Sequence, residues 1–278
     1  TGVTYPAIGV DGQGYALVSQ GYLAGAATPT CWMPTTNLAT SLLNPLVTYQ
    51  FQGYGSSTAI NNNALTITSP SVTYASPFAS TNALTLATPS SYAKFSILVE
   101  SVLNNGAANT VDAVVNFTDG TTQVFPGFSY ANWFSGSATT TAFYQFNRVN
   151  PTNGGLLNVC TAGTYTSQAS MYEMNLNISA ANFGKLVSSI TFTSTSTSST
   201  GTGSGSVNYI HIMAVNGLAP CAVPSDYPTA PLLTAVSTGQ IDGSFTAAAS
   251  APNAYLVVRY PAGAAETFPV NGTSYNVA

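Results

Sequence analysis

Apolar and polar residues alternate with a period of two through much of this chain, the pattern of half-buried β-strands. The clearest case is residues 111–118, where the odd positions are Val, Ala, Val and Phe. Strands with the same character are predicted at residues 15–18, 46–51, 64–68, 83–87, 95–102, 142–149, 172–178, 186–192 and 207–215. Only residues 179–185 suggest a short helix, so the pattern predicts an all-β protein.

A hairpin is predicted at the end of the strand at 111–118. Asp119-Gly120 suits a two-residue type I′ turn, in which both central residues take a positive φ. Such a turn places Phe117 opposite Thr122 and Val115 opposite Val124. Opposed residues share a face of the sheet, so Val115, Phe117 and Val124 are expected to be buried together.

Many short strands separated by Gly, Pro and Asn predict a two-sheet antiparallel sandwich, jelly-roll-like, over residues 1–217. Residues 218–231 are rich in proline and lack periodicity, which predicts a linker. A second β unit is predicted over residues 232–278, with strands at 232–238, 241–248, 254–260 and 266–270. These strands make up only part of an immunoglobulin-like sandwich, so we expect either that the native chain continues past Ala278 or that another chain completes the unit.

Charge is scarce: 4% of the residues are charged, against about a quarter in an ordinary soluble domain. With four basic residues in 278, the chain cannot form the cationic surface that nucleic acids require. No apolar run reaches the ~18 residues of a membrane-spanning helix. A neutral surface rich in Ser, Thr and Asn suits uncharged partners or close packing between copies, and it favours a secreted or cell-surface location.

Two parts of the chain resemble known secreted proteins. Residues 228–278, with the strand Tyr-Leu-Val-Val-Arg at 255–259 and the turn Asn-Gly-Thr-Ser-Tyr at 271–275, resemble the first half of fibronectin type III-like modules in surface proteins of Bacteroidetes-type bacteria. Residues 49–217, with Phe-Thr-Asp-Gly-Thr at 117–121 followed by Trp133, are similar to the jelly-roll domains found upstream of such modules. The family's acidic residue before the tryptophan is Asn132 here. The resemblance implies a cell-surface adhesin or carbohydrate-binding module.

Aromatic residues follow the hairpin and are candidates for a sugar-binding platform, because aromatic faces pack on the C–H patches of sugars. Neutral amides nearby suit the recognition of hydroxyl groups. The alternative is that these aromatics close the core of the sandwich. The candidate ligand-binding residues are Phe128, Tyr130, Asn132, Trp133 and Gln145.

Three cysteines, Cys31, Cys160 and Cys221, allow one disulfide and leave one thiol over. Cys160 is expected to pair with either of the other two. No metal cofactor is expected, because the chain has one histidine and no Cys-x-x-Cys pair. Residues 11–14, Asp-Gly-Gln-Gly, are candidates for a structural calcium site, although a plain glycine-rich turn explains them as well.

Catalytic chemistry is not predicted. A glycosidase needs two carboxyl groups about 5–10 Å apart across a cleft, and Glu100, Asp112 and Glu173 are expected on the outward side of their strands. A nucleophile–histidine–acid triad would have to use His211, and no nucleophile elbow accompanies it. The sequence therefore predicts a non-catalytic adhesin that recognises a neutral glycan or surface ligand, or else a self-assembling subunit of an extracellular filament or surface layer.

Overall fold

In the computed structural model the chain divides into two compact units, Thr1–Ala219 and Pro220–Ala278. The structure describes residues 10, 14–17, 33–34, 36–51, 64–70, 78–104, 108–144, 148–149, 156–157, 169–196, 207–220, 228–249, 255 and 263–265.

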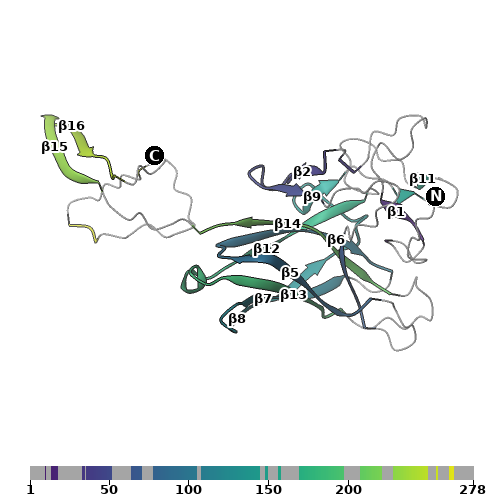
Figure 1. Ribbon diagram of the computed structural model, residues 1–278. Helices are drawn as coiled ribbons and strands as arrows, with labels where there is room; N and C mark the ends of the chain where they lie inside the picture. The colour runs from purple at the N-terminus through teal and green to yellow at the C-terminus, as the bar shows by residue number, and fades with distance from the viewer. Residues whose placement is uncertain are drawn as a thin grey trace. The chain divides into compact units, whose positions relative to one another are not determined.

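The first unit contains fourteen strands and one turn of 3₁₀-helix within its described residues (Figure 1). Their bounds are β1 Ala16–Leu17, β2 Leu38–Thr40, β3 Thr48–Gln50, β4 Leu65–Thr68, β5 Thr81–Ser90, β6 Lys94–Val102, β7 Asn109–Phe117, β8 Thr122–Tyr130, β9 Thr141–Tyr144, β10 Arg148–Val149, β11 Leu156–Leu157, β12 Ser170–Asn177, η2 Ala180–Asn182, β13 Val187–Ser194 and β14 Tyr209–Leu218. The predicted strands are present with shifted ends, except that the single strand predicted at residues 142–149 is two strands, β9 and β10, which belong to different sheets. The pattern missed β2 and β11, which are only three and two residues long.

Two antiparallel sheets form the sandwich, with strand orders β4-β14-β6-β12-β9 and β5-β13-β7-β8. Without β9, these two sheets contain eight strands, β4–β8 and β12–β14. Numbered one to eight along the chain, the two strand orders are 1-8-3-6 and 2-7-4-5, which is the jelly-roll arrangement. The five-stranded sheet lies above the four-stranded sheet in Figure 1. The predicted all-β, antiparallel, jelly-roll-like fold is therefore confirmed.

Apolar side chains form two separate cores in the first unit. One core fills the space between the two sheets and is built from the inward residues of β6, β7, β12, β13 and β14. The second core lies on the outer face of the five-stranded sheet, where Leu98, Met171 and Tyr209 pack with Tyr49, Phe51 and Trp133. β2 and β3 contribute to this second core, so the outer face of the five-stranded sheet is covered.

The hairpin between β7 and β8 differs from the predicted one. Gly120 has a φ of 82°, whereas Asp119 does not have a positive φ. The Gly120 amide donates to the Phe117 carbonyl at 3.1 Å, and the Phe117 amide donates to the Thr121 carbonyl at 3.0 Å. This is a three-residue loop, a type I turn followed by a glycine bulge. The extra residue shifts the register by one position, so Val124 pairs with Val114 and is 57% exposed. The predicted burial of Val124 was wrong.

The described part of the second unit is a hairpin of β15, Thr229–Ser237, and β16, Gln240–Thr246, with a few residues beyond it. These strands match the first two strands predicted for this unit, and β15 begins within the segment predicted as a linker. The other two predicted strands, at residues 254–260 and 266–270, lie largely or wholly outside the described residues.

Candidate functional site

The predicted aromatic platform is divided between the two cores. Tyr130 ends β8 and is 7% exposed, with its ring 5.7 Å from that of Tyr172 in the core between the sheets. Trp133 is 1% exposed and belongs to the second core. Phe128 is half-buried against the first core. Tyr130 and Trp133 thus close the cores and offer no open ring face to a sugar.

Asn132 makes three hydrogen bonds in the turn after β8. Its side-chain amide donates to the Leu103 carbonyl at 2.8 Å, and its Oδ1 accepts from the Phe134 amide at 3.3 Å. Its backbone carbonyl accepts from the Tyr172 hydroxyl at 2.7 Å. These bonds occupy the polar groups that were expected to recognise a ligand. Gln145, the fifth predicted site residue, lies outside the described residues.

A different surface has the character expected of a neutral binding site. The outward residues of the four-stranded sheet form three rows across the strands, and together we call them the neutral face. The register places Thr81, Thr193 and Asp112 in the first row, Ala83, Thr191, Val114 and Val124 in the second, and Thr85, Ser189, Asn116 and Thr122 in the third. All of them are half-buried or exposed.

Hydrogen bonds between side chains hold the polar groups of the neutral face in place. The Asn116 amide donates to Ser189 Oγ and to Thr191 Oγ1, both at 3.0 Å. Thr81 Oγ1 donates to Thr193 Oγ1 at 3.1 Å. These bonds hold the hydroxyl oxygens of Ser189, Thr191 and Thr193 in place, and each hydroxyl can still bond to a further partner.

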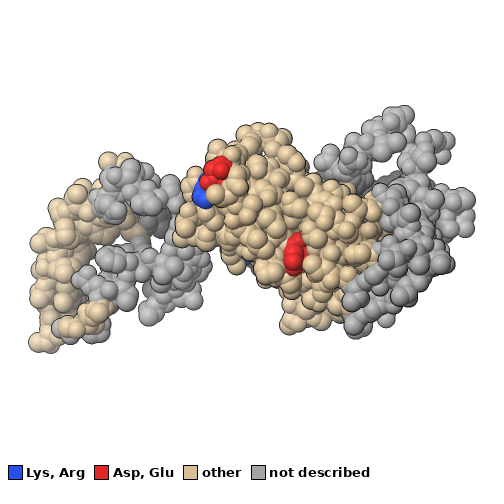
Figure 2. Space-filling model, turned by 90° about the horizontal axis from the view of Figure 1, so that it is seen from below, with Lys and Arg blue, Asp and Glu red and all other residues tan. Residues whose placement is uncertain are grey.

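The neutral face carries few charged atoms, as Figure 2 shows from the side of the four-stranded sheet. The Asp112 carboxylate accepts from the Gly127 amide at 2.7 Å. At the neighbouring turn, Asp119 pairs with Lys185 at 3.2 Å and accepts from the Thr121 amide and hydroxyl. These charges serve local structure. The alternation at residues 189–193 was visible in the sequence, but the pairing that aligns it with β5 and β7 was not.

Two glutamates expected at outward positions lie beneath the second core. Glu100 is fully buried in β6, and Glu173 in β12 is partly buried. Glu173 accepts hydrogen bonds from Tyr49 at 2.7 Å, Ser41 at 2.8 Å and Asn175 at 3.0 Å. Both do point away from the core between the sheets. Their outward positions are as predicted, but the second core on that face buries Glu100 and partly buries Glu173.

His211 is 3% exposed and lies opposite Glu100 in the register. Its Nε2 is 2.7 Å from the Val10 carbonyl, and its Nδ1 is 2.8 Å from Thr66 Oγ1. A carbonyl only accepts, so Nε2 carries a hydrogen. The ring also stacks on Tyr209, at 6.1 Å between centroids. His211 is thus a buried side chain whose two ring nitrogens both have hydrogen-bond partners.

No group of three or more His, Cys, Asp or Glu side chains that could hold a metal occurs among the described residues. The cysteines Cys31, Cys160 and Cys221, and Asp11 of the candidate calcium segment, lie outside those residues. The disulfide and the calcium site therefore stay predictions. In the described segments, no helix has the length and apolar character to span a membrane.

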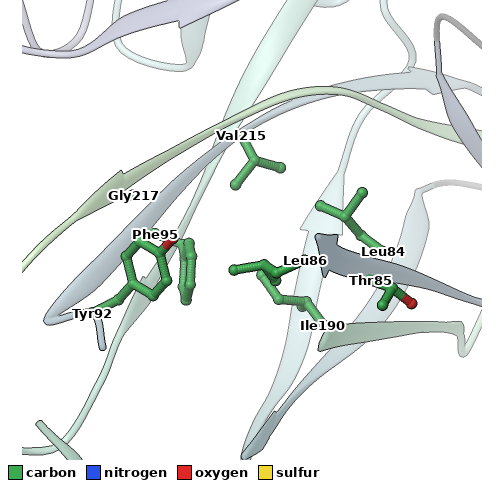
Figure 3. Close-up of a pocket in the computed structure, with 8 residues that line it drawn as sticks. All are labelled: Leu84, Thr85, Leu86, Tyr92, Phe95, Ile190, Val215 and Gly217. Atoms are coloured by element: carbon green, nitrogen blue, oxygen red, sulfur yellow. The ribbon is translucent and has the colours of Figure 1, made fainter. Parts of the chain in front are cut away.

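An apolar hollow opens beside β5, at the margin of the sandwich (Figure 3). Its volume is about 210 Å³. Its walls come from β5, β6, β13 and β14 and from the segment before β6, and its lining residues are Leu84, Thr85, Leu86, Tyr92, Phe95, Ile190, Val215 and Gly217. It is smaller than the roughly 300–1,000 Å³ typical of small-molecule pockets.

Gly217 determines the shape of one end of this hollow. A Cβ at this position would lie 2.5 Å from the ring of Tyr92, so only glycine allows the ring to lie against the β14 backbone. The Tyr92 ring in turn packs at 4.5 Å from Phe95. Figure 3 shows these two rings together at one end, with Leu86 and Ile190 further along.

Comparisons with known proteins found nothing similar to this chain. No family model matches it, and the searches of curated proteins and of solved structures gave no match.

Proposed function

We propose that this chain is a secreted or cell-surface, non-catalytic protein of the adhesin type, and that its neutral face binds an uncharged glycan. The observation that supports this proposal is the arrangement of three rows of fixed neutral groups on an open sheet. Hydroxyl and amide groups dominate the two outer rows, and Ala83, Val114 and Val124 make the middle row apolar. Sugars present the same combination of hydroxyl groups and apolar C–H patches.

The geometry of the neutral face suits an extended chain of sugars. Neighbouring strands are about 4.8 Å apart, and outward residues along one strand repeat at about 7 Å. A flat polysaccharide that lies across the strands would meet Val114 and Val124 with its C–H groups. Its hydroxyls would meet Thr191, Ser189 and Asn116. Asp112 at one side would repel an anionic glycan, so a neutral one is preferred.

Binding to a panel of neutral polysaccharides tests this function. Val124 is exposed, so Val124→Asp should leave the fold intact and weaken binding by roughly tenfold, the effect of losing ~1.4 kcal/mol. Leu46→Asp is the matched control, because Leu46 is 94% exposed and lies next to β3, outside the neutral face. Raising the salt concentration should change binding little, since no ion pair is involved. Failure of the wild type to bind any neutral glycan, or equal binding by Val124→Asp, would contradict the proposal.

A second candidate function is self-assembly into an extracellular filament or surface layer. The observation in its favour is the hairpin β15–β16, which exposes large apolar side chains on one face: Leu233 by 74% and Ile241 by 65%. An isolated two-stranded hairpin is marginally stable in water and gains from a further strand or apolar cover. A second copy of the chain supplies such cover. Concentration-dependent association in solution would support this function, and a strict monomer would exclude it.

A further inference from the structure

The hairpin β15–β16 has two unlike faces. The register pairs Leu233 with Gly243 and Ala235 with Ile241, so these residues share one side. Phe245, two residues after Gly243, lies on the same side, and we call this side the apolar hairpin face. Leu232 and Thr234 pair with Ser244 and Asp242 on the other side, which therefore carries the charge of Asp242. The two faces differ in chemistry although both are exposed.

Gly243 allows the apolar hairpin face to present Leu233. A Cβ on Gly243 would lie 3.2 Å from Leu233 Cδ2, so the absence of a side chain there leaves room for the leucine over the backbone. Leu233 and Ile241 then project as the most exposed apolar groups of this face. The face offers a neighbouring molecule branched aliphatic side chains without a charge among them.

The hollow in the first unit has the complementary character. Between the pairs Ser189–Thr85 and Val187–Ser90, β13 has one residue, Ser188, whereas β5 has four, 86–89. This part of β5 therefore leaves the ladder, and the hollow opens beside it between the two sheets. Among the described residues β5 pairs with β13 alone, so it is the edge strand of its sheet. An apolar hollow next to such an edge is the arrangement that recognises an added strand, with the backbone paired and a side chain inserted.

The apolar hairpin face and the hollow are both apolar and uncharged, so the two surfaces are complementary in chemistry. The described residues that line the hollow are Leu, Ile, Val, Phe and Tyr with one threonine and one glycine, and none of them is charged. Its volume of about 210 Å³ fits a side chain better than a whole ligand. The apolar hairpin face supplies side chains of this size.

We propose that the apolar hairpin face of one copy of this chain docks at the hollow and the free β5 edge of a second copy, with Leu233 or Ile241 inserted into the hollow. This rests on the second candidate function, self-assembly, and names its interface. The two surfaces are different, so the contact is heterologous and each copy keeps one free surface of each kind. Such a contact builds an open row of copies.

Sedimentation of the full chain over a wide concentration range tests the interface. Leu233→Asp places a charge on the apolar hairpin face and should weaken association at least about tenfold, as expected for a lost buried leucine. Leu232→Asp is the matched control on the opposite face of the same hairpin and should associate like the wild type. On the other surface, Leu86→Asp and the uncharged, hollow-filling Val215→Phe should both weaken association, and Leu46→Asp should not. Circular dichroism establishes that each variant is folded.

Mixing two variants distinguishes this contact from others. Leu233→Asp keeps an intact hollow and Leu86→Asp keeps an intact hairpin, so an equimolar mixture should form one-to-one pairs and nothing larger. If both hollow variants associate like the wild type while Leu233→Asp does not, hairpins pair with each other and the proposed interface is wrong. A wild type that stays monomeric overturns self-assembly and this interface together. The glycan-binding proposal keeps its own test in either case, because Val114 and Val124 are not among the lining residues of the hollow.

Discussion

The Tyr49 hydroxyl donates a 2.7 Å hydrogen bond to Glu173 Oε2, and this contact connects β3 to β12 across 124 residues of sequence. Ser41, which directly follows β2, donates to the same oxygen at 2.8 Å. One carboxylate therefore fastens both strands of the small β2–β3 sheet to the five-stranded sheet. The second core, which includes Tyr49 itself, lies around this contact.

Tyr49→Phe should lower the free energy of unfolding by about 1.5–3 kcal/mol, the range for a hydrogen bond to a charged group. The phenyl ring keeps its packing, so the loss reports the hydroxyl alone. Urea denaturation of Tyr49→Phe, Glu173→Gln and the double variant would measure the coupling between the two residues. Additive effects of the two substitutions would show that the bond contributes little.

Trp133→Ala should cost about 3–5 kcal/mol, because a fully buried indole leaves a cavity in the second core. A binding site at this residue would instead predict a folded protein with weakened ligand affinity. Thermal unfolding of Trp133→Ala beside Val124→Asp separates the two roles. A Trp133→Ala protein as stable as the wild type would contradict the observed burial.

Gly120→Ala should destabilise the protein by about 1 kcal/mol, because alanine is strained at a φ of 82°. A Cβ at this position would meet no other atom within 4 Å, so the effect comes from the backbone alone. Gly184→Ala is the matched control, since its Cβ also has open space and its φ is not positive. This control should be neutral or slightly stabilising in chemical denaturation. Equal effects of the two substitutions would contradict the positive φ of Gly120.

Stability should fall at alkaline pH because buried tyrosines resist ionisation. Burial raises the pKa of Tyr172 to about 12. Burial also raises the pKa of Tyr130, with a smaller contribution from the negative charge of Glu173. Unfolded tyrosines lose their protons near pH ~10, so above that pH the unfolded state binds fewer protons than the native state and the free energy of unfolding decreases. Denaturation between pH 8 and 12 should show this decline, with a shallower slope for Tyr172→Phe.

The Asp119 carboxyl should make the free energy of unfolding decrease as the pH falls in the acidic range. Hydrogen bonds from the Thr121 hydroxyl and amide, and then the contact with Lys185, lower the pKa of this carboxyl to about 2. Its contribution to stability is complete above the unfolded value near ~4 and disappears as the pH falls from there towards 2. NMR titration of the Asp119 carboxyl would check the midpoint, and Thr121→Ala should raise it. A midpoint that Thr121→Ala leaves unchanged would exclude the threonine as the cause.

The sequence by itself determined the strands and the chemistry of the surface. Alternation with a period of two predicted β6, β7, β12, β13 and β14. Successive side chains of a strand point to opposite faces of the sheet, and one of these faces packs against the core between the sheets. The composition also determined that the surface carries little charge, since only 4% of the residues are charged and they cannot create a strong field. The all-β, two-sheet fold followed from these local patterns.

Only the tertiary structure decided which faces are open. Glu100 and Glu173 alternate away from the core between the sheets, yet Glu100 is buried and Glu173 is partly buried. Glu173 contacts Tyr49 of β3 and Ser41 after β2, and alternation does not reveal a cover that comes from a distant segment. The turn at Asp119-Gly120 took one residue more than expected, and because side chains alternate at every position this moved Val124 from the core to the surface. The neutral face depends on the pairing of β5, β13, β7 and β8, which are distant in sequence, so its rows exist only in the folded protein.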